Sequence, residues 1–452
     1  MKKPRFKLST SQFILIGFLL VILLGSILLS LPVSSANGKP VPYVDALFTA
    51  TTSSCVTGLV TLPTFSSWSI FGQIVILILI QVGGLGVVTV LSGFMILIHR
   101  KIGIAKRMLI QDSFNLNTLS GMVSFVKKVF LGTVIVESIG AVAYMTVFVP
   151  RFGAKGIWIS FFNSVSAFCN AGIDIIAEDS LCGYALNPAV NIITCLLIVL
   201  GGLGYIVWWD IIRVIALKKR QKISFWNALT LHSKIAVFAT VFLILTGALC
   251  FFIFEYNNPK TIKDYSLFEK IQACIFQSVT TRTAGFATIP QENFTNASSL
   301  ISLLLMFIGG SPVGTAGGIK TVTVIVLIST AVSVVKNKNE VNLFSRKLSQ
   351  TAIRKAIAVT VISFFTMFLS TVLLAAVTNA DSIDILYESV SATATVGLTR
   401  SLTPTLNIWG KIIIIFTMYF GRVGPISIAF AFKSKNKNEN IIVNPTEEIS
   451  VG

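Results

Sequence analysis

The chain has 452 residues, of which 54% are hydrophobic and only 12% are charged. A soluble globule of this size needs more polar surface, so the composition indicates an integral membrane protein. The net charge of +18 does not indicate nucleic-acid binding, because Lys and Arg lie in short clusters between long apolar runs. The six cysteines form no CxxC pair and the two histidines are distant in sequence, so no metal or redox site is predicted.

The N-terminal apolar run resembles a secretory signal, since basic residues precede it and small residues follow it. The run from Phe13 to Leu31 is longer than a signal core of about 7–15 residues and matches a membrane helix of about 20. We therefore expect an uncleaved first span.

Apolar runs long enough to cross a bilayer recur eight times. Their approximate ranges are 12–31, 71–97, 125–149, 190–212, 235–254, 299–335, 356–377 and 408–430. An even number places both termini on one side. Cytoplasmic segments of membrane proteins are enriched in Lys and Arg. Here basic residues cluster before the first span, within 99–128, 213–234 and 336–355, and in the tail, so both termini are assigned to the cytoplasm. The sequence therefore predicts a multi-pass plasma-membrane protein with cytoplasmic termini.

The external segments form a repeat, because each ends in a Thr/Ser/Gly-rich loop after a half-apolar stretch of about 15 residues. The loop glycines follow one another at intervals of 114, 113 and 112 residues: Gly58, Gly172, Gly285 and Gly397. A second glycine cluster follows each loop glycine at a similar interval, and the clusters begin at Gly83, Gly201, Gly309 and Gly421. Because both the loop glycines and the second glycine clusters recur at regular intervals in four copies, we predict four equivalent units. Each unit is a helix, a descending pore helix, an extended loop and a second helix.

The predicted fold is an all-α integral membrane protein in which four pseudo-symmetric helix–pore loop–helix repeats, with eight transmembrane helices, surround a central pore. The expected repeats are residues 1–110, 111–222, 223–345 and 346–432, and residues 433–452 form a cytoplasmic tail.

The four loops predict a cation filter. Extended backbone at membrane depth is tolerated where protein buries it or where it lines a watery path. Four such loops around one axis provide a ring of carbonyls that replaces the hydration shell of a monovalent cation, and glycine allows the required backbone angles. One loop alone is better explained as a tight turn, but four in register favour a filter. The candidate residues are Val56, Thr57, Gly58, Asn170, Ala171, Gly172, Thr283, Ala284, Gly285, Thr395, Val396 and Gly397.

The second glycine clusters have two explanations. Close helix packing alone explains Gly83 to Gly86 and Gly201 to Gly204. It does not explain the third copy, because Ser299 to Val335 exceeds one span and carries glycines and a proline at its centre, so this helix must break. A phosphate-binding loop is excluded, since Ile319 separates the last glycine from the lysine. We expect no nucleotide binding in this chain and no enzyme activity.

Two ionisable residues lie deep in apolar sequence and are functional candidates. Arg422 is expected to face the axis just cytoplasmic of the filter, where its charge opposes cation passage. Glu137 is expected to pair with an Arg, Lys or hydroxyl of a neighbouring helix rather than to relay protons. The predicted gate is irregular backbone beneath the filter, held shut in part by Arg422. Its candidate residues are Gly309, Gly310, Ser311, Pro312, Val313, Gly314, Thr315, Ala316, Gly317, Gly318, Lys320 and Arg422.

The four loops, the glycine-rich break and the Gly421 to Gly424 segment together resemble the Trk/Ktr/HKT superfamily of K⁺ transporters, and the length and eight spans are most similar to its KtrB-type members. The resemblance implies that Gly58, Gly172, Gly285 and Gly397 are the filter glycines, that the break is an intramembrane gating loop, and that Arg422 contacts this loop.

The resemblance also implies a homodimer in membrane lipid with one pore per subunit, a cytosolic nucleotide-binding RCK-type regulatory ring, K⁺ as the permeating ion, and Na⁺-stimulated uptake in some members. It implies no organic cofactor. In plant relatives a serine in the first filter accompanies Na⁺ transport, so Gly58 favours K⁺. Only Thr395 to Gly397 matches the first three positions of a TVGYG filter.

A secondary cation or Na⁺-coupled solute symporter, with the broken helix as its substrate site, is the alternative. An accessory or structural subunit is a third possibility. Four parallel repeats favour conduction over both.

Overall fold

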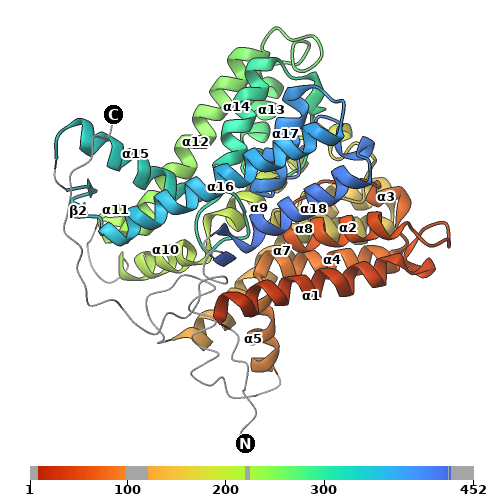
Figure 1. Cartoon of the computed structure of the whole chain (residues 1–452), viewed down its shortest axis with the longest axis horizontal. Coiled ribbons are helices and arrows are strands. Elements are labelled where there is room, and N and C mark those ends of the chain that lie inside the picture. Colours follow the sequence, from red (N-terminus) through yellow and green to blue (C-terminus); the bar gives the residue numbers. More distant parts are fainter. Residues whose placement is uncertain (1–8, 98–120, 219–223, 339, 426, 429–452) are drawn as a thin grey trace, which may run out of the picture.

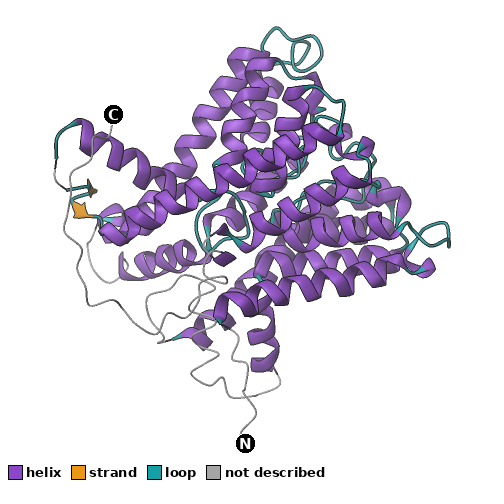
Figure 2. Cartoon of the chain, in the orientation of Figure 1, coloured by secondary structure: helices purple, strands orange, loops and turns teal. Residues whose placement is uncertain are grey.

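The computed structural model describes residues 9–97, 121–218, 224–338, 340–425 and 427–428, and it is predominantly helical (Figure 2). Expectations for residues 99–120 and for the tail 433–452 lie outside the described residues. Within the described part, four helices are long and apolar enough to cross a membrane, and two bent helix pairs raise this number to six. Many large apolar side chains on these helices face outward, which is typical of a protein that lies in lipid.

The first unit contains two long helices and one short buried helix between them. Its elements are α1 (Thr10–Ser30), η1 (Pro32–Ser34), α2 (Tyr43–Cys55), α3 (Thr64–Ser67), α4 (Ile70–Leu85) and α5 (Val87–Leu97). The second unit has the same order, with elements α7 (Met122–Phe152), α8 (Lys155–Cys169), η2 (Cys182–Tyr184), α9 (Pro188–Leu203) and α10 (Tyr205–Lys218).

The third unit differs because its last helix is interrupted. Its elements are α11 (Phe225–Ala228), α12 (Leu231–Glu255), α13 (Leu267–Thr280), η3 (Gln291–Asn293), α14 (Asn296–Phe307) and α15 (Thr321–Val335). A short antiparallel hairpin follows, formed by β1 (Asn342–Leu343) and β2 (Arg346–Lys347). The fourth unit has elements α16 (Gln350–Val377), α17 (Ser382–Ala394), η4 (Thr403–Thr405) and α18 (Ile408–Val423).

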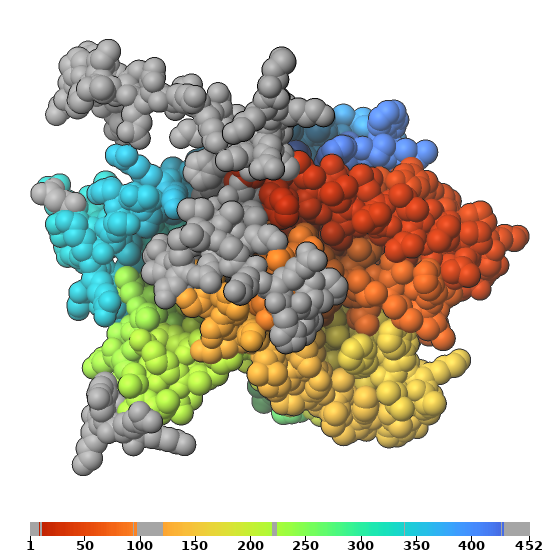
Figure 3. Space-filling model, turned by 90° about the horizontal axis from the view of Figure 1, so that it is seen from below, coloured from red at the N-terminus to blue at the C-terminus, as the bar shows by residue number. Residues whose placement is uncertain are grey.

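The units close into a circle, because the helix after each loop packs against the short helix of the next unit. These pairs are α4 with α8, α9 with α13, α14 with α17, and α18 with α2. The last pair brings the blue end of the chain beside its red beginning (Figure 1). Seen from below, the segments from red to cyan follow one another around the molecule in chain order (Figure 3).

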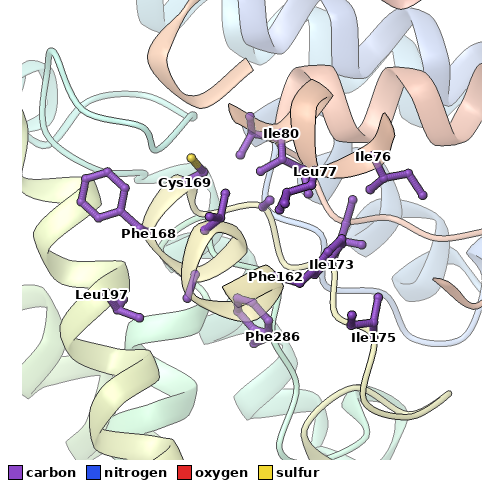
Figure 4. Close-up of a cluster of buried hydrophobic side chains, with 14 of the residues drawn as sticks. Ile76, Leu77, Ile80, Phe162, Phe168, Cys169, Ile173, Ile175, Leu197 and Phe286 are labelled. Carbon is purple, nitrogen blue, oxygen red and sulfur yellow. The ribbon is translucent and has the colours of Figure 1, made fainter. Parts of the chain in front are cut away.

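The largest buried apolar cluster lies where the first and second units meet. Figure 4 shows Ile76 and Ile80 of α4 facing the loop side of α8, with Phe168 at the end of α8. Leu197 of α9 lies on the other side of the same cluster. This packing holds the end of α8, from which the second loop leaves, in a defined position.

Two expected spans are not straight. The expected spans 71–97 and 190–212 are each two helices, with bends of 99° between α4 and α5 and 94° between α9 and α10. The bends occur at Gly86 (φ 82°) and Gly204 (φ 87°), backbone angles that residues with a side chain rarely adopt. The prediction that these clusters serve packing alone therefore fails at Gly86 and Gly204, whereas Gly83 and Gly201 do pack closely, against the carbonyls of Ser54 and Phe168.

Candidate functional site

The four loops share one backbone pattern. Each has a residue in the left-handed region at or just after the end of the short helix, namely Val56 (φ 54°), Asn170 (φ 59°), Thr283 (φ 66°) and Thr395 (φ 50°). Two residues later each has a glycine with positive φ, namely Gly58 (97°), Gly172 (64°), Gly285 (79°) and Gly397 (97°). The four loops therefore share the same pair of positive-φ positions.

The first and second loops touch at their glycines. A Cβ atom at Gly58 would lie 2.5 Å from the carbonyl oxygen of Ala171 and 3.2 Å from the Cα of Gly172. The second loop meets the third in the same way, because a Cβ at Gly172 would lie 2.6 Å from the carbonyl oxygen of Ala284. In each case the neighbour is the carbonyl of the residue directly before the next glycine.

The third and fourth loops complete this arrangement. A Cβ at Gly285 would lie 2.6 Å from the carbonyl oxygen of Val396, and one at Gly397 would collide with the carbonyl oxygen of Thr57 in the first loop. Each glycine is therefore in contact with the next loop, and the last returns to the first. The twelve predicted filter residues lie in one closed ring of backbone, with no room for a side chain at its glycines.

Four hydroxyl residues that the sequence analysis missed hold the loops against their helices. They are Thr52, Ser166, Thr280 and Ser391. Their carbonyls accept hydrogen bonds of 2.8–3.0 Å from the backbone N–H of Thr57, Ala171, Ala284 and Val396. In the first and fourth loops the hydroxyl accepts a hydrogen bond from the glycine N–H, 2.9 Å for Gly58 and 3.0 Å for Gly397. In the second loop it accepts from the N–H of the residue after the glycine (3.2 Å), and in the third it donates to the carbonyl of that residue (2.6 Å). A Ser or Thr six residues before the loop glycine, five in the third loop, is the sequence signal for these positions.

We expect Ser391→Ala to weaken the fourth loop, because it leaves the buried N–H of Gly397 without its acceptor, at a cost of about 1–3 kcal/mol. The K⁺ over Na⁺ permeability ratio and the thermal unfolding midpoint should both fall, and Ser391→Thr should preserve them. Ser389→Ala is the matched control, because its buried hydroxyl on the same helix has no partner among the described residues. Equal effects of the two alanine variants would contradict the anchoring role.

A segment without helix, residues 308–320, separates α14 from α15, as the sequence predicts. Its two ends pair with each other, since Gly309 N–H donates to the Ile319 carbonyl (3.0 Å) and Thr321 N–H donates to the Gly310 carbonyl (3.0 Å). Residues 309–320 therefore form a closed loop, called the lasso below, whose two ends lie side by side. Of the predicted gate residues, those from Gly309 to Lys320 all belong to it, and most are buried.

The second unit holds one side of the lasso. Ser311 N–H donates to the Gly202 carbonyl (2.8 Å), Thr315 N–H donates to the Gly201 carbonyl (3.1 Å), and the N–H of Tyr205 donates to the carbonyl of Val313 (3.0 Å). The Thr315 hydroxyl donates to the side-chain oxygen of Asn170 in the second loop (3.0 Å).

The other side of the lasso lies against the fourth loop. A Cβ at Gly317 would lie 2.6 Å from the Ala394 carbonyl oxygen and would collide with the Thr395 hydroxyl. Gly310 and Ala316 also face each other across the lasso, where a Cβ at Gly310 would lie 2.5 Å from that of Ala316. The glycines therefore allow the lasso to close on itself and to lie against the second and fourth loops.

Two cationic side chains bind three successive carbonyls of the lasso. Arg422 of α18 donates to the Thr315 carbonyl (2.6 Å) and to the Gly83 carbonyl in α4. Lys320 donates to the carbonyls of Ala316 (2.5 Å) and Gly317 (3.2 Å). Arg422 therefore joins the first and fourth units to the broken helix of the third, directly below the ring.

The structure corrects the expected environment of Glu137. Its carboxylate accepts a hydrogen bond from the Gln81 amide (3.3 Å) and lies 3.8 Å from the Cys169 sulfur, so no Arg, Lys or hydroxyl binds this carboxylate among the described residues. The Ser164 hydroxyl binds only the backbone carbonyl of Glu137 (2.7 Å). Glu137 lies on α7 and joins it to α4 and to the end of α8. Because Gly84 packs against Cys169, this contact lies close to the carbonyls that Arg422 binds.

Outside the ring, a cavity of about 340 Å³ is lined by the four loop glycines and by acidic residues of the second and third units. The acidic residues are Asp174, Glu178, Asp179 and Glu292. Asp174 lies two residues after Gly172, in the loop beyond the helices. Burial raises the pKa of Asp174 from 3.8 to about 6, although the Ser180 hydroxyl and the backbone N–H of Ile176 oppose this shift by stabilising the ionised form.

We expect cation uptake to fall as the external pH is lowered through about 6, because Asp174 is ionised above this pKa and neutral below it. One negative charge in this cavity attracts a cation by about 1 kcal/mol. Its loss therefore lowers the local cation concentration by up to about fivefold. Uptake measured from pH 7.5 to 5 should lose this step in Asp174→Asn and keep it in Glu292→Gln. A step that persists in Asp174→Asn would assign the titration to another group.

Apolar helices of membrane length around four converging loops are typical of membrane transport proteins. The chain belongs to the TrkH family, described as cation transport protein, because residues 6–442 match that family. This confirms the resemblance found in the sequence.

Two relatives match over nearly the whole chain. The Ktr system potassium uptake protein B of Bacillus subtilis (strain 168) is 38% identical over 422 residues, which is 93% of this chain and 92% of the relative. The potassium/sodium uptake protein NtpJ of Enterococcus hirae is 38% identical over 438 residues, 95% of this chain and 94% of the relative. The crystal structure of the potassium transporter TrkH from Vibrio parahaemolyticus matches with a TM-score of 0.73 and 16% identity over 96% of this chain and 86% of that one, which shows a shared fold.

Proposed function

We propose that this chain is the ion-translocating subunit of a K⁺ uptake system of the cell membrane, with channel-like conduction driven by the membrane potential. The observation that carries this proposal is that each loop glycine contacts the next loop and the last contacts the first. Backbone from all four units therefore surrounds one axis. Relatives named for potassium uptake support K⁺ as the permeating ion.

The chemistry of the ring suits a monovalent cation. Carbonyls of Thr57, Ala171, Ala284 and Val396 lie at the ring and can replace water around a dehydrated ion. The short helices α2, α8, α13 and α17 all end next to the ring, and each adds the partial negative charge of a helix C-terminus. Both effects favour a cation and oppose an anion.

The proposed topology has eight spans in four repeats, with bounds at 1–110, 111–222, 223–345 and 346–432 and both termini in the cytoplasm. In this topology α14 and α15 together form one broken crossing. The distribution of basic residues supports the orientation.

The lasso from Gly309 to Lys320 is the proposed gate, and Arg422 holds it closed. Its support is the position of the lasso below two filter loops and the binding of three successive lasso carbonyls by Arg422 and Lys320. A fixed positive charge at this depth also repels a permeating cation.

A homodimer, a cytosolic RCK-type ring and stimulation by Na⁺ are further parts of this proposal, implied by the family. The name of the Bacillus relative, a protein of a Ktr system, supports a second component, and that of the Enterococcus relative includes sodium. A ring would dock on the cytoplasmic ends of the helices and on the segments between them.

The test is electrogenic K⁺ efflux from liposomes that contain the purified chain. Vesicles loaded with K⁺ are diluted into Na⁺-free medium with a protonophore, and H⁺ entry reports the potential that K⁺ efflux creates. We expect H⁺ entry without any Na⁺ gradient, since about 2.3 kcal/mol per 100 mV is available to one moving charge. Transport that requires an imposed Na⁺ gradient would instead support the symporter, whose substrate site would be the broken helix.

A further inference from the structure

Helix α10 begins at the gate and leads away from it. After the 94° bend at Gly204, its first residue, Tyr205, donates its N–H to the lasso carbonyl of Val313 (3.0 Å). The last turn of α9 holds the lasso through the carbonyls of Gly201 and Gly202. A displacement of α10 therefore acts directly on the lasso backbone.

Two contacts place the middle of α10 at one end of the long helices. Lys128, in the basic pair near the start of α7, lies over the Trp209 ring at 5.3 Å. Asp210 accepts hydrogen bonds from the Thr230 N–H (2.9 Å) and hydroxyl (2.8 Å) at the start of α12. In the orientation of the proposed function, on which this inference rests, both contacts lie at the cytoplasmic boundary of the membrane.

The outward face of α10 is apolar. Val207 and Val214 are buried against the protein, whereas Ile212 is 51% and Ile215 is 48% exposed. The tryptophans at 208 and 209 are partly exposed between these two faces. Aliphatic side chains combined with tryptophan at this depth are typical of a helix that lies in the membrane interface.

The charge around this face is positive. Asp210 is the only acidic residue within 203–254, and Arg213 (2.6 Å) and Thr230 occupy its two carboxylate oxygens. Lys127, Lys128 and Lys218 are exposed nearby, and the Arg213 side chain is 53% exposed. Arg213 is paired with Asp210, but the three lysines have no acidic partner among the described residues, and an apolar face bordered by such cations is complementary to lipid with an anionic headgroup.

We propose that α10, together with Lys128, binds anionic phospholipid headgroups of the cytoplasmic leaflet, and that this contact sets the position of the gating lasso. Lipid bound along α10 holds the helix in the interface, and the Tyr205 to Val313 hydrogen bond transmits that position to the backbone below the filter. Anionic lipid content then controls conduction without any contact between lipid and filter.

Native mass spectrometry of the purified full-length protein tests the binding, with phosphatidylglycerol and phosphatidylcholine of identical acyl chains as probes. We expect the double variant Lys128→Gln, Lys218→Gln to bind phosphatidylglycerol about 30-fold more weakly, as the loss of two interfacial cations predicts. Phosphatidylcholine binding should be unchanged, and the variant Lys128→Arg, Lys218→Arg should restore phosphatidylglycerol binding. The matched control is Lys336→Gln, Lys338→Gln, which removes two exposed cations at the end of α15.

Electrogenic K⁺ efflux from liposomes with and without phosphatidylglycerol tests the link to the gate. The wild type and the α15 control should respond to the anionic lipid, and the Lys128, Lys218 double variant should not. If the double variant binds phosphatidylglycerol as well as the wild type does, the lipid site on α10 is wrong. This is also the result expected if α10 docks a cytosolic protein instead of lipid. Lost binding with an unchanged response overturns the link to the lasso. Absence of conduction in every liposome overturns the proposed function, while the binding measurement still decides the lipid site.

Discussion

Replacing Gly58 with serine is expected to reduce the preference for K⁺ over Na⁺ by about fivefold to thirtyfold. The added Cβ would lie 2.5 Å from the Ala171 carbonyl oxygen and 3.3 Å from the Cα of Gly397, so the ring has to open at this point. Gly58 also has φ 97°, and left-handed backbone costs a residue with a side chain about 1–2 kcal/mol. Permeability ratios from reversal potentials in K⁺ and Na⁺ gradients measure the change.

Gly183→Ser is the matched control for this variant. Gly183 lies in the second unit outside the ring, where a Cβ meets no atom within 4 Å. We expect its ion preference to equal that of the wild type. An unchanged permeability ratio in Gly58→Ser, in protein that is folded and inserted, would contradict the assignment of the glycine ring as the filter.

Replacing Arg422 with glutamine is expected to raise K⁺ flux by about tenfold or more and to weaken any dependence on a cytosolic regulator. The variant loses charge-assisted hydrogen bonds to Thr315 and Gly83, each worth about 1.5–3 kcal/mol, and it removes a fixed positive charge below the ring. The closed gate loses these hydrogen bonds and this charge, whereas the contacts among the four loop glycines do not involve Arg422. Ion preference should therefore stay close to that of the wild type, and tracer flux into liposomes measures the rate.

Lys411→Gln is the control on the same helix, because Lys411 pairs with Asp45 (2.5 Å) and belongs to neither the ring nor the lasso. It is expected to lower stability without raising flux. Deleting part of the lasso should reproduce the Arg422→Gln result. Loss of flux in a correctly inserted deletion variant would make the lasso part of a binding site and would favour the symporter.

The arrangement of the four loops could be predicted from the sequence because it depends on residues with few substitutes. Gly58 and its three equivalents have positive φ and no space for a Cβ, so each copy keeps its glycine at a regular interval. The hydroxyls that anchor the loops were missed because both Ser and Thr serve, and the third copy has a different spacing. Aligning the four loops on their glycines reveals Thr52, Ser166 and Ser391 at the same position.

The bends, and the particular carbonyls that Arg422 binds, could not be predicted. Gly86 and Gly204 lie within apolar runs long enough for one straight span, and packing explains such glycines equally well. The contacts of Arg422 are with backbone carbonyls, which every residue has, so no residue type identifies Thr315 or Gly83 as its acceptors. The partners of Glu137, Gln81 and Cys169, lie on two other helices and depend on tertiary packing.

The most direct test of the central claim is to locate a bound monovalent cation in the protein structure by anomalous scattering from Tl⁺. The glycine ring predicts Tl⁺ on the axis enclosed by Gly58, Gly172, Gly285 and Gly397, and addition of K⁺ should displace it. Tl⁺ bound at the break between α14 and α15, with none inside the ring, would contradict conduction through the four loops.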